Sequence, residues 1–364
     1  MIVTAESMFF PEPLRLTSGR RLHGYTLRFE SYGTLSATRD NAVLICHGLT
    51  HNAHAAGRYD ESDTVAGWWD NLVGPGKSID TDRFYVICIN CLGGCAGSTG
   101  PSSIDPHTEC PYGLRFPVIT IGDMVQSQKQ LTDQLGINRF KSVIGGCMGG
   151  FQALEWMVRF PRIVDSTIII STAWQSSAHT LALWQVLRQA IMDDPNFQNG
   201  DYYEGPGPIA GMGLASMFGM LIWMSTDMMA HRFGRSIEKA SIDYTLDAEY
   251  SIQHFFNRIR KNSSSSFDPN SLIYLTKAMD YFDLTRGGIL LPDVFRDCLA
   301  KVLLVSYNSD WRYPPEKMAI MSEAMAAAGL STECKVLESP FGHGAFHCDS
   351  DGIGREINRF LNDS

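Results

Sequence analysis

The sequence predicts an α/β protein in which a mostly parallel central sheet is flanked by helices and interrupted by a helical insertion. Three features predict it: near-continuous apolar strand-like runs, helix-like segments that alternate with them, and a middle stretch where the strands stop. Strands that are covered on both faces are apolar along their whole length, as in a parallel sheet between helices. The alternation itself is typical of a doubly wound fold.

The expected strands are bounded by turn residues and occur in both halves of the chain. They span residues 41–46, 83–89, 140–144, 164–170, 301–306 and 333–337. The helices that alternate with them are expected at residues 119–135, 150–159, 315–328 and 352–361. In the first of these, Met124, Leu131 and Leu135 recur at helical spacing on one face.

The strand pattern divides the chain into a core domain and an insertion. Residues 1–171 and 293–364 carry the strands and form the expected core, and residues 172–292 form the expected helical lid. Within the lid, helix-like segments cover residues 181–192 and 214–229. A chain of 364 residues with 44% hydrophobic content can bury a core of this size.

The lid carries a stripe of methionine and tryptophan side chains: Met217, Met220, Trp223, Met224 and Met228. Such a stripe packs in a core or a dimer interface, or forms a pliable cover over an active site. A short serine-rich stretch, residues 262–266, is expected to be a loop within the lid.

Composition excludes several classes of partner. The net charge of −9 gives no basic surface for nucleic acid or an anionic membrane. Residues 1–22 lack the pattern of a signal peptide, and no run approaches the roughly 20 apolar residues of a membrane span. Nine cysteines, an odd number scattered through strands and loops, suit reduced thiols. We therefore expect a cytoplasmic protein.

The most informative motif is Gly145-Gly146-Cys147-Met148-Gly149-Gly150, between a β-branched run and a helix-forming run. A nucleophile on a sharp strand-to-helix turn needs small residues two positions before and after it, and Gly145 and Gly149 meet that requirement. The turn places Cys147 at a helix N-terminus, which favours thiolate over thiol. Alone, the motif also fits a buried cysteine in a glycine-rich turn.

Asp310 and His343 complete a catalytic constellation. Each follows a late strand, residues 301–306 and 333–337 respectively, and the chain order is nucleophile, acid, histidine. Taken separately, the aspartate fits a turn or helix cap and the histidine fits a solvated loop. Together, and at these element boundaries, the three residues predict the α/β-hydrolase fold with a Cys-His-Asp triad.

An oxyanion hole requires two backbone N–H groups, and two loops can supply them. Met148 follows the nucleophile, and Leu49 follows the strand at residues 41–46. His47, His51 and His54 on the same loop have an alternative interpretation as metal ligands, as does the Cys91/Cys95 pair. Neither set has further ligands at metal-site spacing, so we expect no metal ion.

A set of longer motifs resembles the homoserine O-acetyltransferase family of α/β-hydrolase-fold acyltransferases over nearly the whole chain. The motifs are Gly67-Trp68-Trp69-Asp70, Gly74-Pro75-Gly76-Lys77, Ile79-Asp80-Thr81-Asp82, Leu92-Gly93-Gly94-Cys95, Gly97-Ser98-Thr99-Gly100-Pro101, Pro111-Tyr112-Gly113, Gln152-Ala153-Leu154-Glu155-Trp156, Arg188-Gln189-Ala190-Ile191, Asp280-Tyr281-Phe282 and Ser309-Asp310-Trp311. The resemblance implies an acyl-CoA co-substrate with no cofactor, a covalent acyl-enzyme, a helical lid and a homodimer. It places the triad on Cys147, Asp310 and His343.

Departures from the family pattern bear on the acceptor. The family's nucleophile is usually serine, and the acid that usually follows the catalytic histidine is Gly344 here. His51 and Asn52 stand where Gly-Asp is common. Arg188 resembles the family's carboxylate-binding arginine, and one arginine can clamp a carboxylate with two bonds. The resemblance thus implies substrate contacts at Arg188, His51 and Gly344 and a small carboxylate-bearing acceptor.

The expected reaction moves an acyl group, acetyl in the first instance, through a Cys147 thioester to a hydroxyl or amine of that acceptor. An acyl-cysteine stays reactive because thioester exchange costs little free energy. The alternatives are a cysteine-dependent hydrolase or thioesterase and a binding protein on a degenerate hydrolase fold. Within acyl transfer, homoserine or serine acetylation and a specialised acceptor both stay open.

Overall fold

The computed structural model describes residues 1–263 and 267–363. Within them, one main sheet has eight strands in the order β1-β4-β8-β5-β9-β10-β11-β12. The strands are β1 (Ala5–Phe10), β4 (Tyr25–Tyr32), β5 (Ala42–Cys46), β8 (Tyr85–Ile89), β9 (Ser142–Gly146), β10 (Ser166–Ile170), β11 (Lys301–Tyr307) and β12 (Thr332–Leu337). The expected α/β fold with a mostly parallel sheet is confirmed.

The six predicted strands form the parallel part of this sheet, from β8 to β12. β5, β9 and β10 are buried along their whole length, which is why their sequences are continuously apolar. β1 and β4, which pair antiparallel at one edge, were not expected from the sequence. Two small two-stranded sheets join β2 (Leu14–Arg15) to β3 (Arg21–Leu22) and β6 (Val73–Gly74) to β7 (Ile79–Asp80).

The four helices predicted in the core are present. They are α1 (Ile121–Gln134), α2 (Met148–Arg159), α9 (Pro315–Ala327) and α11 (Ser350–Asp363). Thr120 caps α1 in a capping box with Asp123, and α2 begins at the residue after Cys147. Three shorter elements complete the core: η1 (Gly113–Arg115), η4 (Gly342–Gly344) and α10 (Ala345–Cys348).

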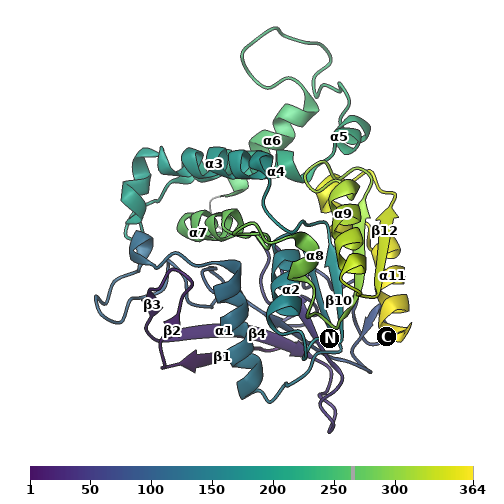
Figure 1. Ribbon diagram of the computed structural model, residues 1–364. Coiled ribbons are helices and arrows are strands. Elements are labelled where there is room, and N and C mark those ends of the chain that lie inside the picture. The colour runs from purple at the N-terminus through teal and green to yellow at the C-terminus, as the bar shows by residue number, and fades with distance from the viewer. Residues whose placement is uncertain (264–266, 364) are drawn as a thin grey trace.

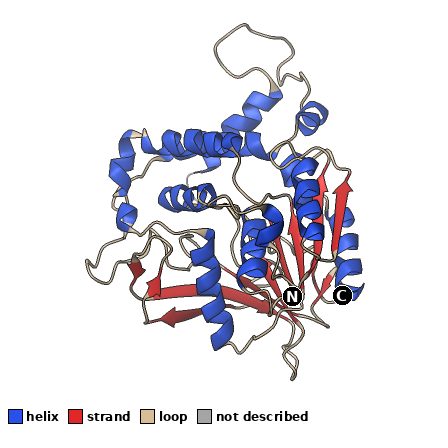
Figure 2. Ribbon diagram, in the orientation of Figure 1, coloured by secondary structure: helices blue, strands red, loops and turns tan. Residues whose placement is uncertain are grey.

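Between β10 and β11 the chain forms a helical layer. Its elements are α3 (Ala178–Met192), η2 (Pro195–Gly200), α4 (Ile209–Trp223), α5 (Thr226–Arg232), α6 (Ser251–Asn262) and α7 (Pro269–Asp280), and the chain then returns to the core through α8 (Leu291–Val294), which packs against α9. Figure 1 shows α3, α4 and α6 above the carboxyl ends of the strands, with α7 beneath α3, and Figure 2 shows the sheet below this layer. Ser264–Ser266 of the predicted serine-rich loop lie outside the described residues.

The predicted helix at residues 214–229 is two helices, because the chain bends between α4 and α5. Ser225 ends the run and caps α5 by accepting a hydrogen bond from the Met228 amide. Among the described residues, no single helix is long and apolar enough to cross a membrane; α4 and α5 pass only as a pair, by length and composition, and they are bent by 100°.

The bend fastens the helical layer to the loops that follow β11 and β12. The Trp311 indole donates to the Met224 carbonyl at 3.1 Å, and the Ser225 hydroxyl donates to the Pro340 carbonyl. Gly342 has a φ of +69°, and a Cβ there would lie 2.6 Å from the Ser225 amide nitrogen. The loop of His343 therefore packs directly against the α4–α5 bend.

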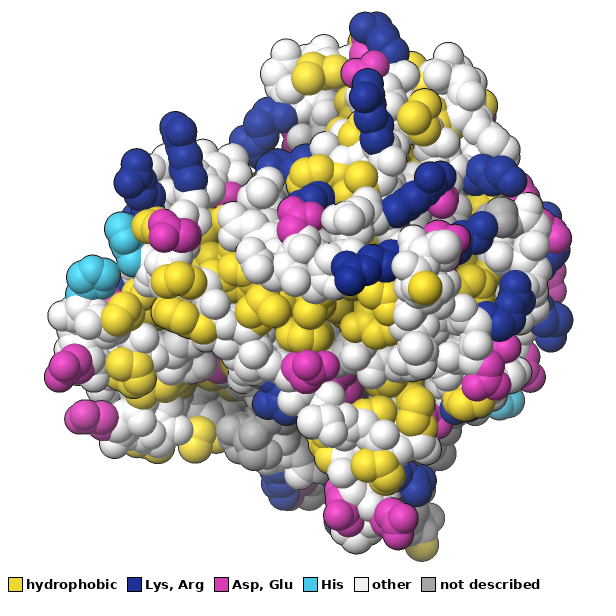
Figure 3. Space-filling view, turned by 90° about the horizontal axis from the view of Figure 1, so that it is seen from below, with side chains coloured by type: hydrophobic (Ala, Val, Ile, Leu, Met, Phe, Trp, Pro, Cys, Tyr) yellow, Lys and Arg dark blue, Asp and Glu magenta, His cyan; other side chains and the backbone are white. Residues whose placement is uncertain are grey.

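On the face of the molecule seen in Figure 3, hydrophobic side chains form a band with charged side chains of both signs around it.

The nine cysteines are all free.

Candidate active site

Cys147 lies on the sharp turn that the sequence predicts, between β9 and α2. Its backbone is held at φ 56° and ψ −123°, a strained conformation for a residue with a side chain. A Cβ at Gly145 would lie 2.1 Å from the Gly149 carbonyl oxygen, and a Cβ at Gly149 would lie 2.0 Å from that of Cys46. Only glycine fits at either position, as the nucleophile-elbow interpretation requires.

The predicted acid and histidine meet beside this turn. The His343 Nδ1 atom lies 2.9 Å from Asp310 Oδ2, and the other carboxylate oxygen accepts from the backbone amides of Arg312 and Tyr313, both at 3.0 Å. These contacts fix the carboxylate, which in turn orients the imidazole. The opposite ring nitrogen, Nε2, is buried on the side of the Cys147 sulfur, and both residues line the same cavity.

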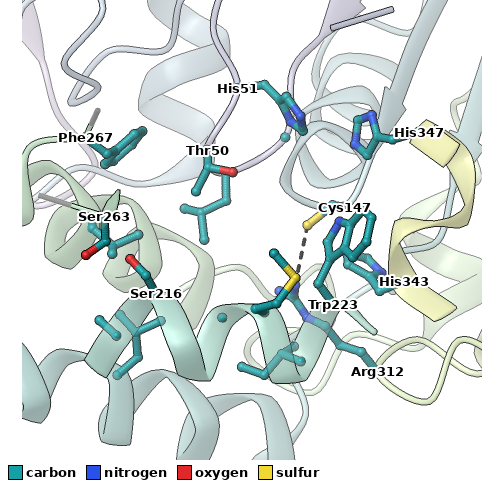
Figure 4. Close-up of a pocket in the computed structure, with 18 of the residues that line it drawn as sticks. Thr50, His51, Cys147, Ser216, Trp223, Ser263, Phe267, Arg312, His343 and His347 are labelled. Carbon is teal, nitrogen blue, oxygen red and sulfur yellow. Dashed lines mark hydrogen bonds between the residues drawn. The ribbon is translucent and has the colours of Figure 1, made fainter. Parts of the chain in front are cut away.

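Arg312 is a site residue that the sequence analysis missed. Its Nη1 atom donates to the Cys147 sulfur at 3.6 Å, drawn as the dashed line in Figure 4. The buried guanidinium lies over the rings of Trp184 and Tyr313, at 4.5 and 4.8 Å from their centroids. Its position two residues after the predicted acid, Asp310, was the signal in the sequence that could have identified it.

The charges around Cys147 favour its thiolate. Burial opposes that charge, but Arg312, His343 and the Met148 amide together lower the pKa of the Cys147 thiol to about 6. Burial also opposes a charged imidazole, but Asp310 and Cys147 raise the pKa of His343 to about 9. Near neutral pH the pair is therefore a thiolate beside an imidazolium, and its titration belongs to both groups.

The loop after β5 lies against the elbow and is held by His47. The Cys91 amide donates to His47 Nε2 at 3.0 Å, so Nδ1 carries the proton and donates to the Gly48 carbonyl at 2.8 Å. Leu49 on this loop lines the same cavity as Cys147, and Met148 is the first residue of α2, where helix geometry leaves an N–H free. Both residues predicted to supply the oxyanion donors thus lie beside Cys147.

The three histidines of this loop have separate partners. His47 holds the loop itself, His54 pairs with Glu30 at 2.9 Å, and His51 lines the cavity. Within the part of the chain that the structure describes, no group of three or more His, Cys, Asp or Glu residues is placed to hold a metal ion.

Cys147 lies at one side of a cavity of about 450 Å³ between the core and the helical layer. Figure 4 shows His343, Arg312, His51 and His347 around the sulfur, with Ser216, Ser263 and Phe267 farther along. Two members of the methionine–tryptophan stripe, Met220 and Trp223, line the cavity, whereas Met224 and Met228 are buried. The stripe therefore forms part of the cover over the site and part of the core.

Arg188 is not among the residues that line the cavity, and the substrate contact expected of it stays a prediction. It pairs with Asp280 at 2.7 Å, in a buried ion pair that joins α3 to α7. Gly344 is next to the site, but a Cβ there would lie 2.2 Å from the Trp223 ring. Trp223 therefore fills the space into which a side chain at position 344 would point.

Comparison with known proteins agrees with this geometry. Residues 41–347 match the family described as alpha/beta hydrolase fold. The chain is 42% identical to the homoserine O-acetyltransferase of Methanosalsum zhilinae, over 99% of this chain and 73% of that protein. It is 44% identical to the homoserine O-succinyltransferase of Laribacter hongkongensis, over 95% of this chain and 91% of the relative.

Solved structures of related proteins also have the same fold as this chain. The homoserine O-acetyltransferase of Bacillus anthracis superposes with a TM-score of 0.93 at 30% identity, covering 100% of this chain and 98% of the other. Esterase E22 superposes with a TM-score of 0.90, also at 30% identity, covering 99% of this chain and 100% of the other. The chain therefore belongs to the homoserine O-acyltransferase family of proteins with the α/β-hydrolase fold.

Proposed function

We propose that the protein is an acyltransferase that takes an acyl group from acyl-CoA onto Cys147 and passes it to a small acceptor. The observation that carries the proposal is the Cys147 sulfur on its elbow, in contact with Arg312 and beside the His343–Asp310 pair. The names of the acetyl- and succinyltransferase relatives support transfer as the reaction type. An acetyl group is the first donor to test.

In the first half-reaction, the Cys147 thiolate attacks the thioester carbonyl of acyl-CoA. The N–H groups of Leu49 and Met148 stabilise the oxyanion that forms. When the bond to the CoA sulfur breaks, the leaving thiolate takes the proton from His343 Nε2, and Cys147 is left as a thioester. One thioester replaces another, so this step costs little free energy.

In the second half-reaction, His343 removes a proton from the acceptor as the acceptor attacks the acyl-cysteine carbonyl. The bond to the Cys147 sulfur then breaks, and the released thiolate is stabilised by Arg312 and by the protonated imidazole. Asp310 keeps the imidazole oriented through both steps, and no group outside the chain and its two substrates is needed.

Ester or thioester hydrolysis is the second candidate, because esterase E22 shares 30% identity and the same fold. In that reaction water would take the place of the acceptor. The cavity argues for transfer, since aromatic and aliphatic side chains such as Leu187, Met212 and Phe267 form much of its lining and disfavour water.

The experiment is intact-mass measurement after brief mixing with acetyl-, propionyl- and longer acyl-CoA, with Cys147→Ala as the control. We expect a mass gain equal to the acyl group, absent from the variant and cleared by an added alcohol or amine. Rapid CoA release without an acceptor would favour hydrolysis instead. No adduct and no CoA release with any donor would refute the proposal.

We also propose that the protein is a homodimer in the cytoplasm. The outer faces of α3 and α4 expose large apolar side chains: Leu181, Val186, Met192, Ile209, Leu214 and Leu221. A second copy would cover such a surface. A reducing compartment would keep Cys147 reduced. Sedimentation equilibrium tests the first point: we expect twice the chain mass, and a monomer would contradict it.

A further inference from the structure

Two histidines that the proposed mechanism does not use face the cavity beside Cys147. His51 comes from the loop after β5 and His347 from α10, and their ring centroids are 4.3 Å apart. Trp68 lies against His51, with 4.8 Å between ring centroids. Figure 4 shows the two imidazoles next to each other above the sulfur, with His343 below it.

Both imidazoles have an unused polar atom. The Nδ1 atoms of His51 and His347 are buried and have no hydrogen-bond partner. A buried polar atom without a partner is costly, and a bound water or ligand is one way in which a native structure satisfies it. Both histidines line the same cavity as the proposed nucleophile.

Neither imidazole carries a charge at neutral pH. Burial lowers the pKa of His51 to about 3, and His47 adds to this effect. Burial lowers the pKa of His347 far below its ordinary value, and both His51 and His343 oppose its protonation. A neutral imidazole offers one donor and one acceptor, which suits a hydroxyl group and gives no counter-ion to an ammonium or a carboxylate.

The rest of the lining also lacks a site for an amino acid. Among the described residues that line the cavity, none is acidic, and Arg312 is the one with a permanent charge. The Arg312 guanidinium already faces the Cys147 thiolate and the Asp310 carboxylate. Trp223 occupies the space beside Gly344. An ammonium group would thus be buried here with no carboxylate beside it, and the Cys147 thiolate already faces Arg312 and His343, so its burial is unfavourable.

We propose that the cavity binds an uncharged, hydroxyl-bearing acceptor with an apolar body, and that His51 and His347 hydrogen-bond one of its hydroxyl groups. The apolar body lies along the aromatic and aliphatic lining, and a second hydroxyl lies within reach of His343. The role of this molecule as acyl acceptor rests on the proposed function. Its binding in the cavity does not depend on that function.

Four small probes that share a phenyl group test the proposal in the unmodified protein without acyl donor. They are 3-phenyl-1,2-propanediol, 3-phenylpropan-1-ol, 3-phenyllactate and phenylalanine, titrated against the fluorescence of the cavity tryptophans. We expect the diol to bind about fivefold tighter than the monoalcohol, the ratio expected of one hydrogen bond. We expect it to bind at least about tenfold tighter than the anion or the zwitterion.

Variants of the two histidines test whether their imidazoles cause the preference for the diol over the monoalcohol. His51→Phe and His347→Phe keep a ring in place but remove the nitrogen atoms, and each should reduce the preference for the diol over the monoalcohol. His347→Asn places an amide near the position of Nδ1 and should keep it. Thermal melting of each variant confirms folding.

Three results would overturn the inference: tighter binding of phenyllactate or phenylalanine than of the diol, an unchanged diol preference in both phenylalanine variants, or no binding of any probe. Because no acyl donor is present, these results do not depend on acyl transfer. Failure of the proposed function would instead be seen as a missing acyl adduct in the mass experiment.

Discussion

Arg188 and Arg312 are both buried arginines, yet they have different partners and different effects on the molecule. Arg188 pairs with the Asp280 carboxylate at 2.7 Å and joins two helices of the layer above the sheet. Arg312 faces the Cys147 sulfur at 3.6 Å. A carboxylate is ionised at neutral pH with or without a cation beside it, so the Arg188–Asp280 pair is a structural link. A thiol is ordinarily not ionised at neutral pH, so Arg312 changes the reactivity of Cys147 by lowering the pKa of its thiol.

The proposed difference between the two arginines requires that the Cys147 sulfur beside Arg312 is the reacting atom. Cys147→Ala should lower the single-turnover rate of CoA release from acetyl-CoA by about 10⁴-fold or more, as expected when the nucleophile of a triad is removed. Stopped-flow detection of free CoA measures the rate. A melting temperature like that of the parent shows that the fold is intact, and retained turnover would refute the assignment.

The next largest effect is expected at the Arg188–Asp280 pair. Asp280→Asn leaves a buried guanidinium without its anion and should lower the free energy of unfolding by about 3–5 kcal/mol. Urea denaturation measures this change. The double variant Arg188→Leu with Asp280→Leu removes both charges and should recover most of the loss. A single variant as stable as the parent would show that the pair has no structural role.

A smaller effect is expected from Arg312→Leu. Without the cation, the pKa of the Cys147 thiol should rise from about 6 by one unit or more, so the thiolate fraction at pH 7 should fall from about nine-tenths to about half or less. The rate of alkylation by iodoacetamide, or thiolate absorbance near 240 nm, reports this fraction and needs no acceptor. An unchanged rate would mean that His343 alone sets the charge of the sulfur.

The smallest effect concerns the pH dependence. Acylation should increase as the pH rises through about 6, where the Cys147 thiolate forms, and decrease above about 9, where His343 loses its proton. Arg312→Lys keeps the positive charge and should move only the lower limb, upward and by less than the leucine variant does. A flat profile between pH 5 and 10 would contradict the thiolate–imidazolium pair.

The parallel strands and the turn that carries Cys147 could be predicted from the sequence, because both depend on local patterns. Continuous apolar runs identify β5, β9 and β10, and the glycines around Cys147 identify the elbow. β4 was missed because Tyr25, Leu27 and Phe29 alternate with less buried residues, so it lacks a continuous run. Alternation of this kind was the available signal.

The cavity wall could not be predicted in the same way. The direction of a side chain from a helix depends on how that helix packs, and spacing along the chain does not determine it. Arg188 points to Asp280 on α7, a partner nearly a hundred residues away in sequence. The α4–α5 bend depends on contacts of Met224 and Ser225 with the loops of Trp311 and Pro340.

Those contacts at the bend have a mechanical consequence. Ser225 and Met224 connect the roof of the cavity to the two loops that carry Asp310 and His343. A movement of α4 away from the core would pull on the same loops and so displace Asp310 and His343. Under the proposed mechanism, opening of the cavity would therefore be coupled to loss of the aligned His343–Asp310 pair.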